Sequence, residues 1–299
     1  MMALAGLAAQ VVGHHEEVLA STIEGKQVIP GGRAFYKMSG SGNDFVVVDA
    51  RHDPPGQLAE PAVVSRICAR GTGVGADGIV FLERSDTADV RLVYLNSDGS
   101  RAEFCGNATL CTTRLAVELG AGGPSGMSIE TDSGIVQARL SRGLPEIDLQ
   151  PVIETSADLG GIPLDPCESR MGFAVVGVPH LVIRCRDVAT VDVVGRGRPL
   201  RSHPSFPRGA NVNFVSAANG RWRMRTYERG VEAETLACGS GAVAAAIMLT
   251  AWSEAKSPVD LETSSGRCLR ISLDRRGQAW QPSLAGEGRV VYQGRLAEI

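Results

Sequence analysis

Two cysteines stand immediately before a glycine and a run of helix-forming residues. Cys105 begins Cys-Gly-Asn-Ala, and Cys238 begins Cys-Gly-Ser-Gly-Ala; the runs that follow, 108–116 and 242–249, predict two helices. The first turn of a helix leaves main-chain N–H groups free and carries a partial positive charge. It therefore binds carboxylates and lowers the pKa of an adjacent thiol, and glycine lets a ligand approach closely. Each motif predicts a reactive sulfur beside a carboxylate site.

The two motifs lie within a duplicated stretch of sequence. Tyr94 and Tyr227 stand at the same spacing before the two cysteines, and Ile-Glu-Thr-Asp-Ser-Gly at 129–134 is echoed by Leu-Glu-Thr-Ser-Ser-Gly at 261–266. The period is much longer than the roughly 20–50 residues of solenoid repeats. We therefore expect two similar lobes, each built from one strand–Cys–helix–hairpin unit, with one sulfur on each side of a shared cleft. Such a pair could remove a proton from one face of a carbon and deliver one to the other, which inverts a stereocentre.

Composition limits the classes of function. The chain has 299 residues, 43% hydrophobic, with a formal net charge of −3 and a pI near 6.0. No basic stripe indicates nucleic acid as a partner, and no run of about 18 apolar residues indicates a membrane span. The start of the chain lacks the basic region of a secretory signal, so we treat 1–33 as an extension of unknown role. Seven cysteines without a C-x-x-C pattern favour free thiols in the cytoplasm over a disulfide framework or a zinc site.

The order of predicted elements divides the chain. We assign 34–151 with the C-terminal strand 289–299 to the first lobe, which carries Cys105, and 152–288 to the second, which carries Cys238. Gly73, Gly75 and Gly78 match G-x-G-x-x-G, but a helix precedes them and a strand follows, the reverse of a dinucleotide site. The segment 188–194 reads as a short helix or irregular structure.

Several polar residues allow both a structural and a functional interpretation. Asn43 is a turn residue or a ligand contact, and His180 is a candidate acid/base whose more common role is a hydrogen-bonded turn residue. Asn213 and its neighbour Asn211 lie among apolar residues, which favours an edge strand. Arg229 is either a surface charge or a residue whose guanidinium binds a carboxylate through two parallel hydrogen bonds. Cys111, six residues into the first helix run, is expected to be buried packing.

At these motifs the sequence resembles the diaminopimelate epimerase family of amino-acid epimerases, which need no pyridoxal phosphate. The resemblance extends from Phe35 to the C-terminus. Its carriers are Ser-Gly-Asn-Asp-Phe at 41–45, Gly-Val-Gly-Ala-Asp-Gly at 73–78, Asn-Ser-Asp-Gly-Ser at 96–100, Ala-Glu-Phe-Cys-Gly-Asn at 102–107, Pro-His at 179–180, Gly-Ala-Asn-Val-Asn-Phe at 209–214, Glu-Arg-Gly at 228–230 and Glu-Thr-Leu-Ala-Cys-Gly-Ser-Gly at 234–241.

The resemblance implies a fold, a reaction and a set of roles. The fold is α+β: two pseudo-symmetric lobes, each a β-barrel-like sheet around a central helix. The reaction converts LL-diaminopimelate to the meso form, for lysine and peptidoglycan precursors, with Cys105 and Cys238 as acid/base pair and neither metal nor cofactor. The α-carboxylate would be bound by Gly106, Asn107, Gly239 and Ser240. The distal amino-acid end would be held by Asn43, Asn96, Asn213, Glu228 and Arg229.

The sequence departs from the family pattern at three positions. Ala108 and Leu110 replace the usual glycine and arginine after Cys-Gly-Asn, and Val178 replaces a common asparagine. These changes bear on the identity of the amino-acid substrate more than on the type of reaction. The alternatives are a proline or hydroxyproline racemase or epimerase of the same fold, a thiol redox protein and a non-catalytic binding protein. The sequence leaves the oligomeric state open, with a homodimer among the options.

Overall fold

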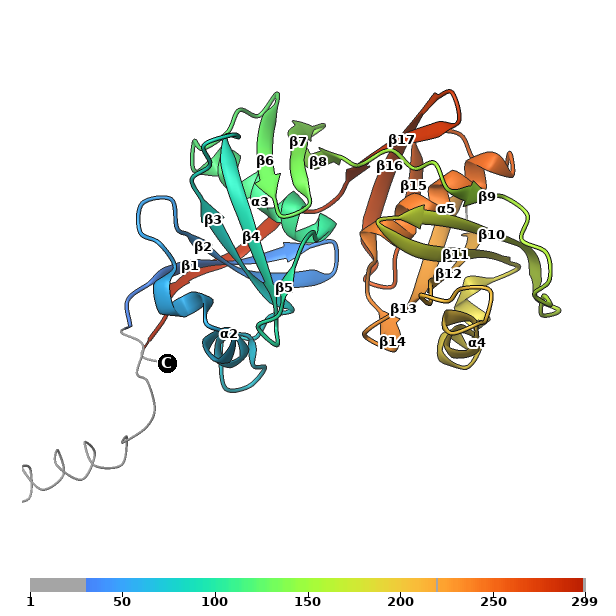
Figure 1. Cartoon of the computed structure of the whole chain (residues 1–299), viewed down its shortest axis with the longest axis horizontal. Helices are drawn as coiled ribbons and strands as arrows, with labels where there is room; N and C mark the ends of the chain where they lie inside the picture. Colours follow the sequence, from blue (N-terminus) through green and yellow to red (C-terminus); the bar gives the residue numbers. More distant parts are fainter. Residues whose placement is uncertain (1–30, 219, 298–299) are drawn as a thin grey trace, which may run out of the picture.

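The computed structural model describes residues 31–218 and 220–297, which form two lobes side by side (Figure 1). Of the expected extension, 1–33, the first 30 residues lie outside this description. Sheets dominate both lobes, and the predicted α+β architecture of two similar lobes is confirmed. Within the described ranges, no helix combines the length and apolar character that crossing a membrane requires.

The first lobe runs from the first strand to the eighth. Its elements are β1 (Ala34–Gly40), β2 (Asn43–Asp49), the 3-10 turn η1 (Gly56–Ala59), α2 (Pro61–Cys68), β3 (Gly78–Glu83), β4 (Val90–Asn96), β5 (Arg101–Ala102), α3 (Gly106–Glu118), β6 (Met127–Thr131), β7 (Gly134–Ser141) and β8 (Leu144–Asp148). The last strand of the chain, β18 (Arg289–Arg295), returns to pair antiparallel with β1.

The second lobe repeats this order. Its elements are β9 (Thr155–Ser156), β10 (Glu168–Val176), β11 (Val178–Cys185), the 3-10 turn η2 (Val188–Thr190), α4 (Val193–Arg201), β12 (Asn211–Ala218), β13 (Arg221–Glu228), β14 (Ala233–Thr235), α5 (Gly239–Ala251), β15 (Val259–Glu262), β16 (Cys268–Arg276) and β17 (Ala279–Ala285).

Strand pairing shows that the duplication extends to topology. Antiparallel β1–β2, parallel β2–β3, antiparallel β3–β4 and parallel β4–β6 in the first lobe correspond to β10–β11, β11–β12, β12–β13 and β13–β15 in the second. The hairpins β6–β7–β8 and β15–β16–β17 also correspond. The two outermost hairpin strands, β8 and β17, pair with each other, so one continuous sheet runs through both lobes.

Each lobe wraps its sheet around one helix. The run 242–249 in α5 is apolar on every side, so the helix is stable only when it is buried all round. All residues from Gly241 to Leu249 are buried, and α5 packs against β10, β11, β12, β15, β16 and β17. The equivalent α3 is buried from Asn107 to Thr113 and packs against β1, β2, β3, β4, β7, β8 and β18.

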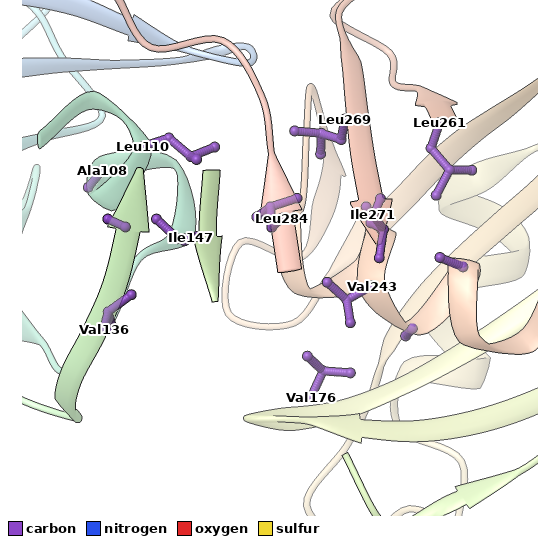
Figure 2. Close-up of a cluster of buried hydrophobic side chains, with 14 of the residues drawn as sticks. Ala108, Leu110, Val136, Ile147, Val176, Val243, Leu261, Leu269, Ile271 and Leu284 are labelled. Carbon is purple, nitrogen blue, oxygen red and sulfur yellow. The ribbon is translucent and has the colours of Figure 1, made fainter. Parts of the chain in front are cut away.

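A single apolar core joins the lobes across the β8–β17 pair. Leu284 on β17 lies between Ala108, Leu110 and Ile147 of the first lobe and Leu269 and Ile271 of the second (Figure 2). All are at most 1% exposed. The junction therefore fixes the starts of α3 and α5 relative to each other.

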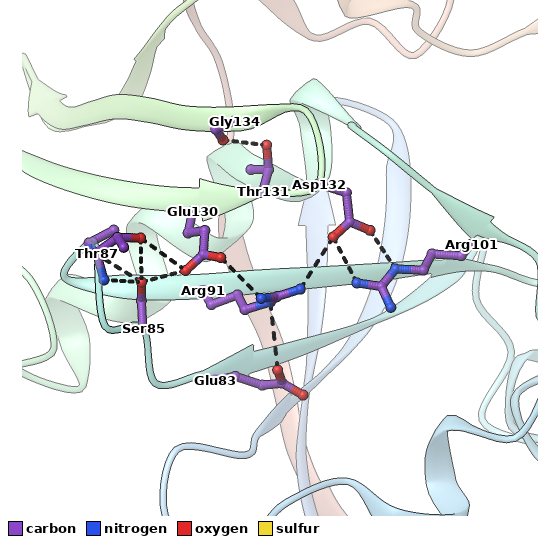
Figure 3. A network of polar contacts seen from close by, with 10 residues as sticks. Glu83, Ser85, Thr87, Arg91, Arg101, Glu130, Thr131, Asp132 and Gly134 are labelled. Atoms are coloured by element: carbon purple, nitrogen blue, oxygen red, sulfur yellow. Dashed lines mark hydrogen bonds and ion pairs between the residues drawn. The ribbon is translucent and has the colours of Figure 1, made fainter.

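A polar network on the first lobe holds the strand that leads to Cys105. Arg101, on β5, donates from its guanidinium to Asp132 in the β6–β7 turn at 2.7 Å (Figure 3). Arg91, on β4, lies between Asp132 and Glu130 and pairs with both. Four neighbouring segments are thus connected just ahead of the first cysteine motif.

The second lobe contains a helix that the sequence did not predict, and one strand is misassigned. The segment 188–194 holds the expected short helix, a 3-10 turn, and then the start of α4, whose nine residues include Gly195, Gly197 and Pro199. These residues lower helix propensity, so the sequence does not indicate the helix. Asp192, at the N-cap, offsets part of this loss because it accepts a hydrogen bond from the Gly195 N–H at 2.9 Å. The strand with two asparagines, β12, is not an edge strand, since β11 and β13 flank it.

Candidate active site

Cys105 occupies the N-cap of α3. Its main chain is extended (φ −141°, ψ 111°), and its carbonyl accepts the first helical hydrogen bond, from Thr109 N–H at 2.9 Å. Burial raises the pKa of the Cys105 thiol to about 11; hydrogen bonds from the Ala108 and Asn107 N–H groups act in the opposite direction. The free N–H groups of the first helical turn thus point at the sulfur, as the sequence motif predicted.

Cys238 occupies the N-cap of α5 in nearly the same conformation (φ −136°, ψ 107°). Ala242 N–H donates to its carbonyl at 2.9 Å, and its sulfur lies 3.6 Å from the Ser240 hydroxyl. Burial, reinforced by the charge of Glu228, raises the pKa of the Cys238 thiol to about 12. The two cysteines are therefore equivalent in backbone geometry, and burial raises the pKa of both thiols.

The two helix starts converge on one methyl group. A β-carbon placed on Gly106 would lie 3.4 Å from Leu284 Cδ2, and one placed on Gly239 would lie 3.1 Å from the same atom. The charge of Cys105 contributes to the raised pKa of Cys238, as expected for neighbouring sulfurs. The structure therefore brings together the four residues assigned to the α-carboxylate (Gly106, Asn107, Gly239 and Ser240) and both thiols.

Glu228 supplies negative charge to this region from the end of β13. Its charge raises the pKa of both Cys105 and Cys238, after the larger effect of burial. Burial raises the pKa of Glu228 itself. Glu228 is a half-buried carboxylate whose charge acts on both thiols, and it lies at a strand end that the sequence assigned to the distal end of the substrate, so it is also a candidate for tuning the thiols.

The side chain of Asn43 forms hydrogen bonds both to Asp77, in the loop before β3, and to Asn107, at the start of α3. Its amide nitrogen donates to Asp77 at 2.9 Å, and its oxygen accepts from the Asn107 amide at 2.6 Å. Arg70 pairs with Asp77 at 2.7 Å, and also with Asp44. Asn43 thus begins β2 beside the first helix start, with both ends of its side-chain amide bonded inside the protein.

Asn213 joins β12 to the second helix start. Its amide nitrogen donates to the Leu181 carbonyl at 3.0 Å and faces His180 Nδ1 at 3.3 Å, and its oxygen accepts from Thr226 at 2.9 Å. A β-carbon on Gly241 would lie 2.3 Å from that oxygen. Asn213 therefore abuts α5 with most of its hydrogen-bonding capacity already used by the protein.

His180 lies inside strand β11, not in a turn, and is fully buried. Burial lowers the pKa of its imidazole to about 3, with a smaller effect from the charge of Arg229. Because Asn213 presents an N–H to Nδ1, the proton of the neutral ring resides on Nε2. His180 is thus neutral near pH 7 and supports Asn213.

Arg229 and Asn96 stand at equivalent strand ends. Arg229 N–H donates to the Asn211 amide oxygen at 2.7 Å, which accounts for that second asparagine, and its guanidinium donates to the Arg208 carbonyl. Among residues 31–218 and 220–297, the structure gives the Arg229 guanidinium no acidic partner. Asn96 ends β4 and donates to Ser100 at 3.0 Å.

Sequence reasoning missed two contributors to the site. Asp77 was read only as part of a glycine-rich loop, although it is a carboxylate next to a strand start; Leu284 had no signal at all. The side chains of the departures Ala108 and Leu110 are fully buried in the core, although the Ala108 N–H bonds to the Cys105 thiol, and Val178 begins β11 half-buried. Cys111 is fully buried, as predicted.

Comparison with known proteins shows the family to which the chain is similar. The family model described as diaminopimelate epimerase matches residues 35–146 and 172–291. A diaminopimelate epimerase from Gemmatimonas aurantiaca is 46% identical over 277 residues, which is 89% of this chain and 100% of the relative. One from Aquifex aeolicus is 38% identical over 275 residues, 88% of this chain and 98% of the relative.

Solved structures extend the likeness of fold. A Bacillus anthracis phenazine biosynthesis protein of the PhzF family superposes with a TM-score of 0.67 at 14% identity, covering 91% of this chain and 99% of that one. A hydroxyproline epimerase from Agrobacterium vitis gives 0.60 at 18% identity, covering 91% and 93%. With the matches in sequence, the duplicated topology and the paired cysteine motifs, the chain belongs to the diaminopimelate epimerase family.

Proposed function

We propose that this protein is an isomerase that inverts one α-carbon of LL-diaminopimelate to give the meso form, using Cys105 and Cys238 as its acid/base pair. The observation that carries the proposal is the presence of two equivalent N-cap cysteines, one from each lobe, whose following glycines both lie next to Leu284 Cδ2. Membership of the family supports the choice of substrate.

The proposed reaction needs one thiolate and one thiol. The thiolate takes the α-proton, and the electron pair of the broken C–H bond stays on the α-carbon and spreads into the carboxylate. The opposite thiol then gives its proton to the other face and becomes the thiolate. Each cysteine acts as the base in one direction of the reaction and as the acid in the other, and burial raises the pKa of both thiols.

The helix starts make this proton transfer feasible. The α-proton of an amino acid is too weakly acidic for a thiolate in water, so the developing negative charge must be stabilised. The N–H groups at 106–107 and 239–240 lie in the first turns of two fully embedded helices, where fixed dipoles act at short range and low dielectric. Removing one such donor in other enzymes lowers the rate by about 10²–10³-fold.

Arg229 favours a substrate with a second carboxylate. Its guanidinium has a carbonyl partner but, within the described ranges, no acidic one, so it can pair with a distal carboxylate. A proline or hydroxyproline substrate carries no such group. We also infer that the reaction takes place in the cytoplasm, where reducing conditions keep both thiols free.

The test is hydrogen exchange at the α-carbon. The purified protein is incubated in heavy water with LL-diaminopimelate, proline and trans-4-hydroxyproline, and α-deuterium is followed by NMR or mass spectrometry. We expect exchange and inversion with LL-diaminopimelate alone, loss of both in Cys105→Ala and Cys238→Ala, and normal turnover in Cys268→Ala, which removes an exposed thiol of the same chain. Turnover by either site variant at the wild-type rate would refute the two-base scheme.

A further inference from the structure

The loop before β3 contains a carboxylate whose hydrogen bonds lead to the first helix start. Asp77 accepts from the Asn43 amide at 2.9 Å and from Asp44 N–H at 3.2 Å, and it pairs with Arg70 at 2.7 Å. A carboxylate held by a guanidinium only accepts hydrogen bonds. Asp77 therefore fixes which way the Asn43 amide points: the nitrogen faces Asp77 and the oxygen faces away.

The orientation of Asn43 in turn fixes that of Asn107. The Asn43 oxygen must receive a donor, and it accepts from the Asn107 amide nitrogen at 2.6 Å. The Asn107 oxygen is consequently turned to the opposite side, toward the second lobe, where a β-carbon placed on Gly239 would lie 3.8 Å from it. The negative charge of Asp77 thus fixes the orientation of the side-chain amides of both Asn43 and Asn107.

The Asn107 oxygen is a buried acceptor without a partner. Asn107 is 4% exposed, and among residues 31–218 and 220–297 no group donates to its Oδ1. Buried polar atoms are nearly always paired, and an orphan is costly to keep. This one lies between the two helix starts that are proposed to hold the α-carboxylate. The group of an amino acid next to its α-carboxylate that carries N–H donors is the α-ammonium.

We propose that Asp77 is a positioning residue that, through Asn43, aims the Asn107 side-chain oxygen at the α-ammonium of the substrate. The inference rests on the proposed function for the identity of that substrate. An ammonium held in this way stays protonated, and its positive charge beside the α-carbon stabilises the negative charge that develops when the proton leaves.

Exchanging the two side chains tests the orientation argument. In Asp77→Asn, residue 77 can offer either its nitrogen or its oxygen to Asn43, so the Asn107 amide is no longer fixed; we expect kcat/KM for LL-diaminopimelate to fall about 10–100-fold. In the double variant Asp77→Asn/Asn43→Asp, residue 43 becomes the acceptor-only group, which again requires the Asn107 nitrogen to face it. We expect at least about tenfold recovery over the single variant.

The matched control is Asp260→Asn, which removes a carboxylate paired with Arg270 in the second lobe and leaves these amides untouched. We expect its kcat/KM to stay within about twofold of wild type. A double variant no more active than Asp77→Asn, with all variants folded by circular dichroism, would overturn the proposal, as would wild-type activity in Asp77→Asn.

Binding of an amine-free analogue tests the choice of the ammonium. Pimelate has both carboxylates of the substrate and neither amino group. We expect Asp77→Asn to weaken binding of meso-diaminopimelate about tenfold or more and to leave pimelate binding unchanged, measured by calorimetry or competition. Equal weakening of both ligands would overturn the ammonium assignment.

A measurement without substrate separates this inference from the proposed function. In wild type the side-chain NH₂ signals of Asn43 and Asn107 should exchange slowly with water in ¹⁵N NMR, because both are bonded inside the protein. The Asn107 signal should lose protection in Asp77→Asn and regain it in the double variant. If the wild type fails to exchange α-deuterium but this pattern holds, the function is wrong and the relay stands; if the Asn107 signal is unchanged in Asp77→Asn, the relay is wrong.

Discussion

The buried His180 should make the stability of the protein depend steeply on pH. Its imidazole accepts from Asn213 on Nδ1 and is fully enclosed, and burial lowers its pKa to about 3. In the unfolded chain the same group titrates near pH 6.5. Between these two values the unfolded state binds a proton that the folded state does not, so the free energy of unfolding falls as pH falls.

The size of the effect follows from the two pKa values. One pH unit within the window is worth about 1.4 kcal/mol, and the loss begins only near pH 6.5, so His180 accounts for about 2 kcal/mol of lost stability between pH 7 and pH 5. Carboxylates with lowered pKa, such as Asp49, add their own loss at lower pH. A comparison with a variant that lacks the imidazole removes their contribution.

The assay is urea unfolding at pH 7, 6 and 5, followed by tryptophan fluorescence, for wild type and His180→Phe. Phenylalanine keeps a ring in the cavity but cannot titrate, and Asn213 retains the Leu181 carbonyl as acceptor. The variant is expected to be less stable at pH 7, yet to lose about 2 kcal/mol less than wild type on going to pH 5. Parallel losses in the two proteins would refute the assignment of a neutral, buried His180.

Three further outcomes test the site and the junction. Because burial raises the pKa of Cys105 to about 11, the thiolate fraction grows with pH, and kcat/KM should rise close to tenfold per pH unit from pH 7 to 9; a flat profile would contradict this. Gly241→Ala should lower kcat and cost about 1–3 kcal/mol in urea unfolding, since its β-carbon would lie 2.3 Å from the Asn213 oxygen; unchanged kinetics would contradict the packing. Ser265→Ala removes a 3.0 Å hydrogen bond from the second lobe to the Ser41 carbonyl of the first and should cost about 1 kcal/mol, with equal unfolding midpoints as the contrary result.

Much of the fold could be predicted because the strongest local signals coincide with the elements that matter. The apolar run 242–249 predicts a helix buried all round, and the glycine after each cysteine predicts where the helices start. The repeated spacing predicts two lobes. The sequence did not predict α4 because its glycines and proline have low helix propensity. In the folded protein, tertiary packing outweighs that low propensity.

The site was harder to predict because its residues act through contacts between distant segments. Asn43, Asp77 and Asn107 read as turn, loop and helix-start residues; only the fold reveals that their side chains form one chain of hydrogen bonds. Likewise, no pattern in the sequence places Glu228 near both sulfurs.

The crossing strands have a consequence for the origin of the molecule. After β8 the chain leaves the first half and adds β9 beside β10; after β17 it leaves the second half and adds β18 beside β1. Each half thus places its last strand beside the first strand of the other half. This reciprocal exchange is the topology that a strand-swapped dimer of two half-length chains would have if the chains were joined end to end. A half expressed separately would lack the strand that the other half places beside its first strand, so the two halves are expected to fold only together.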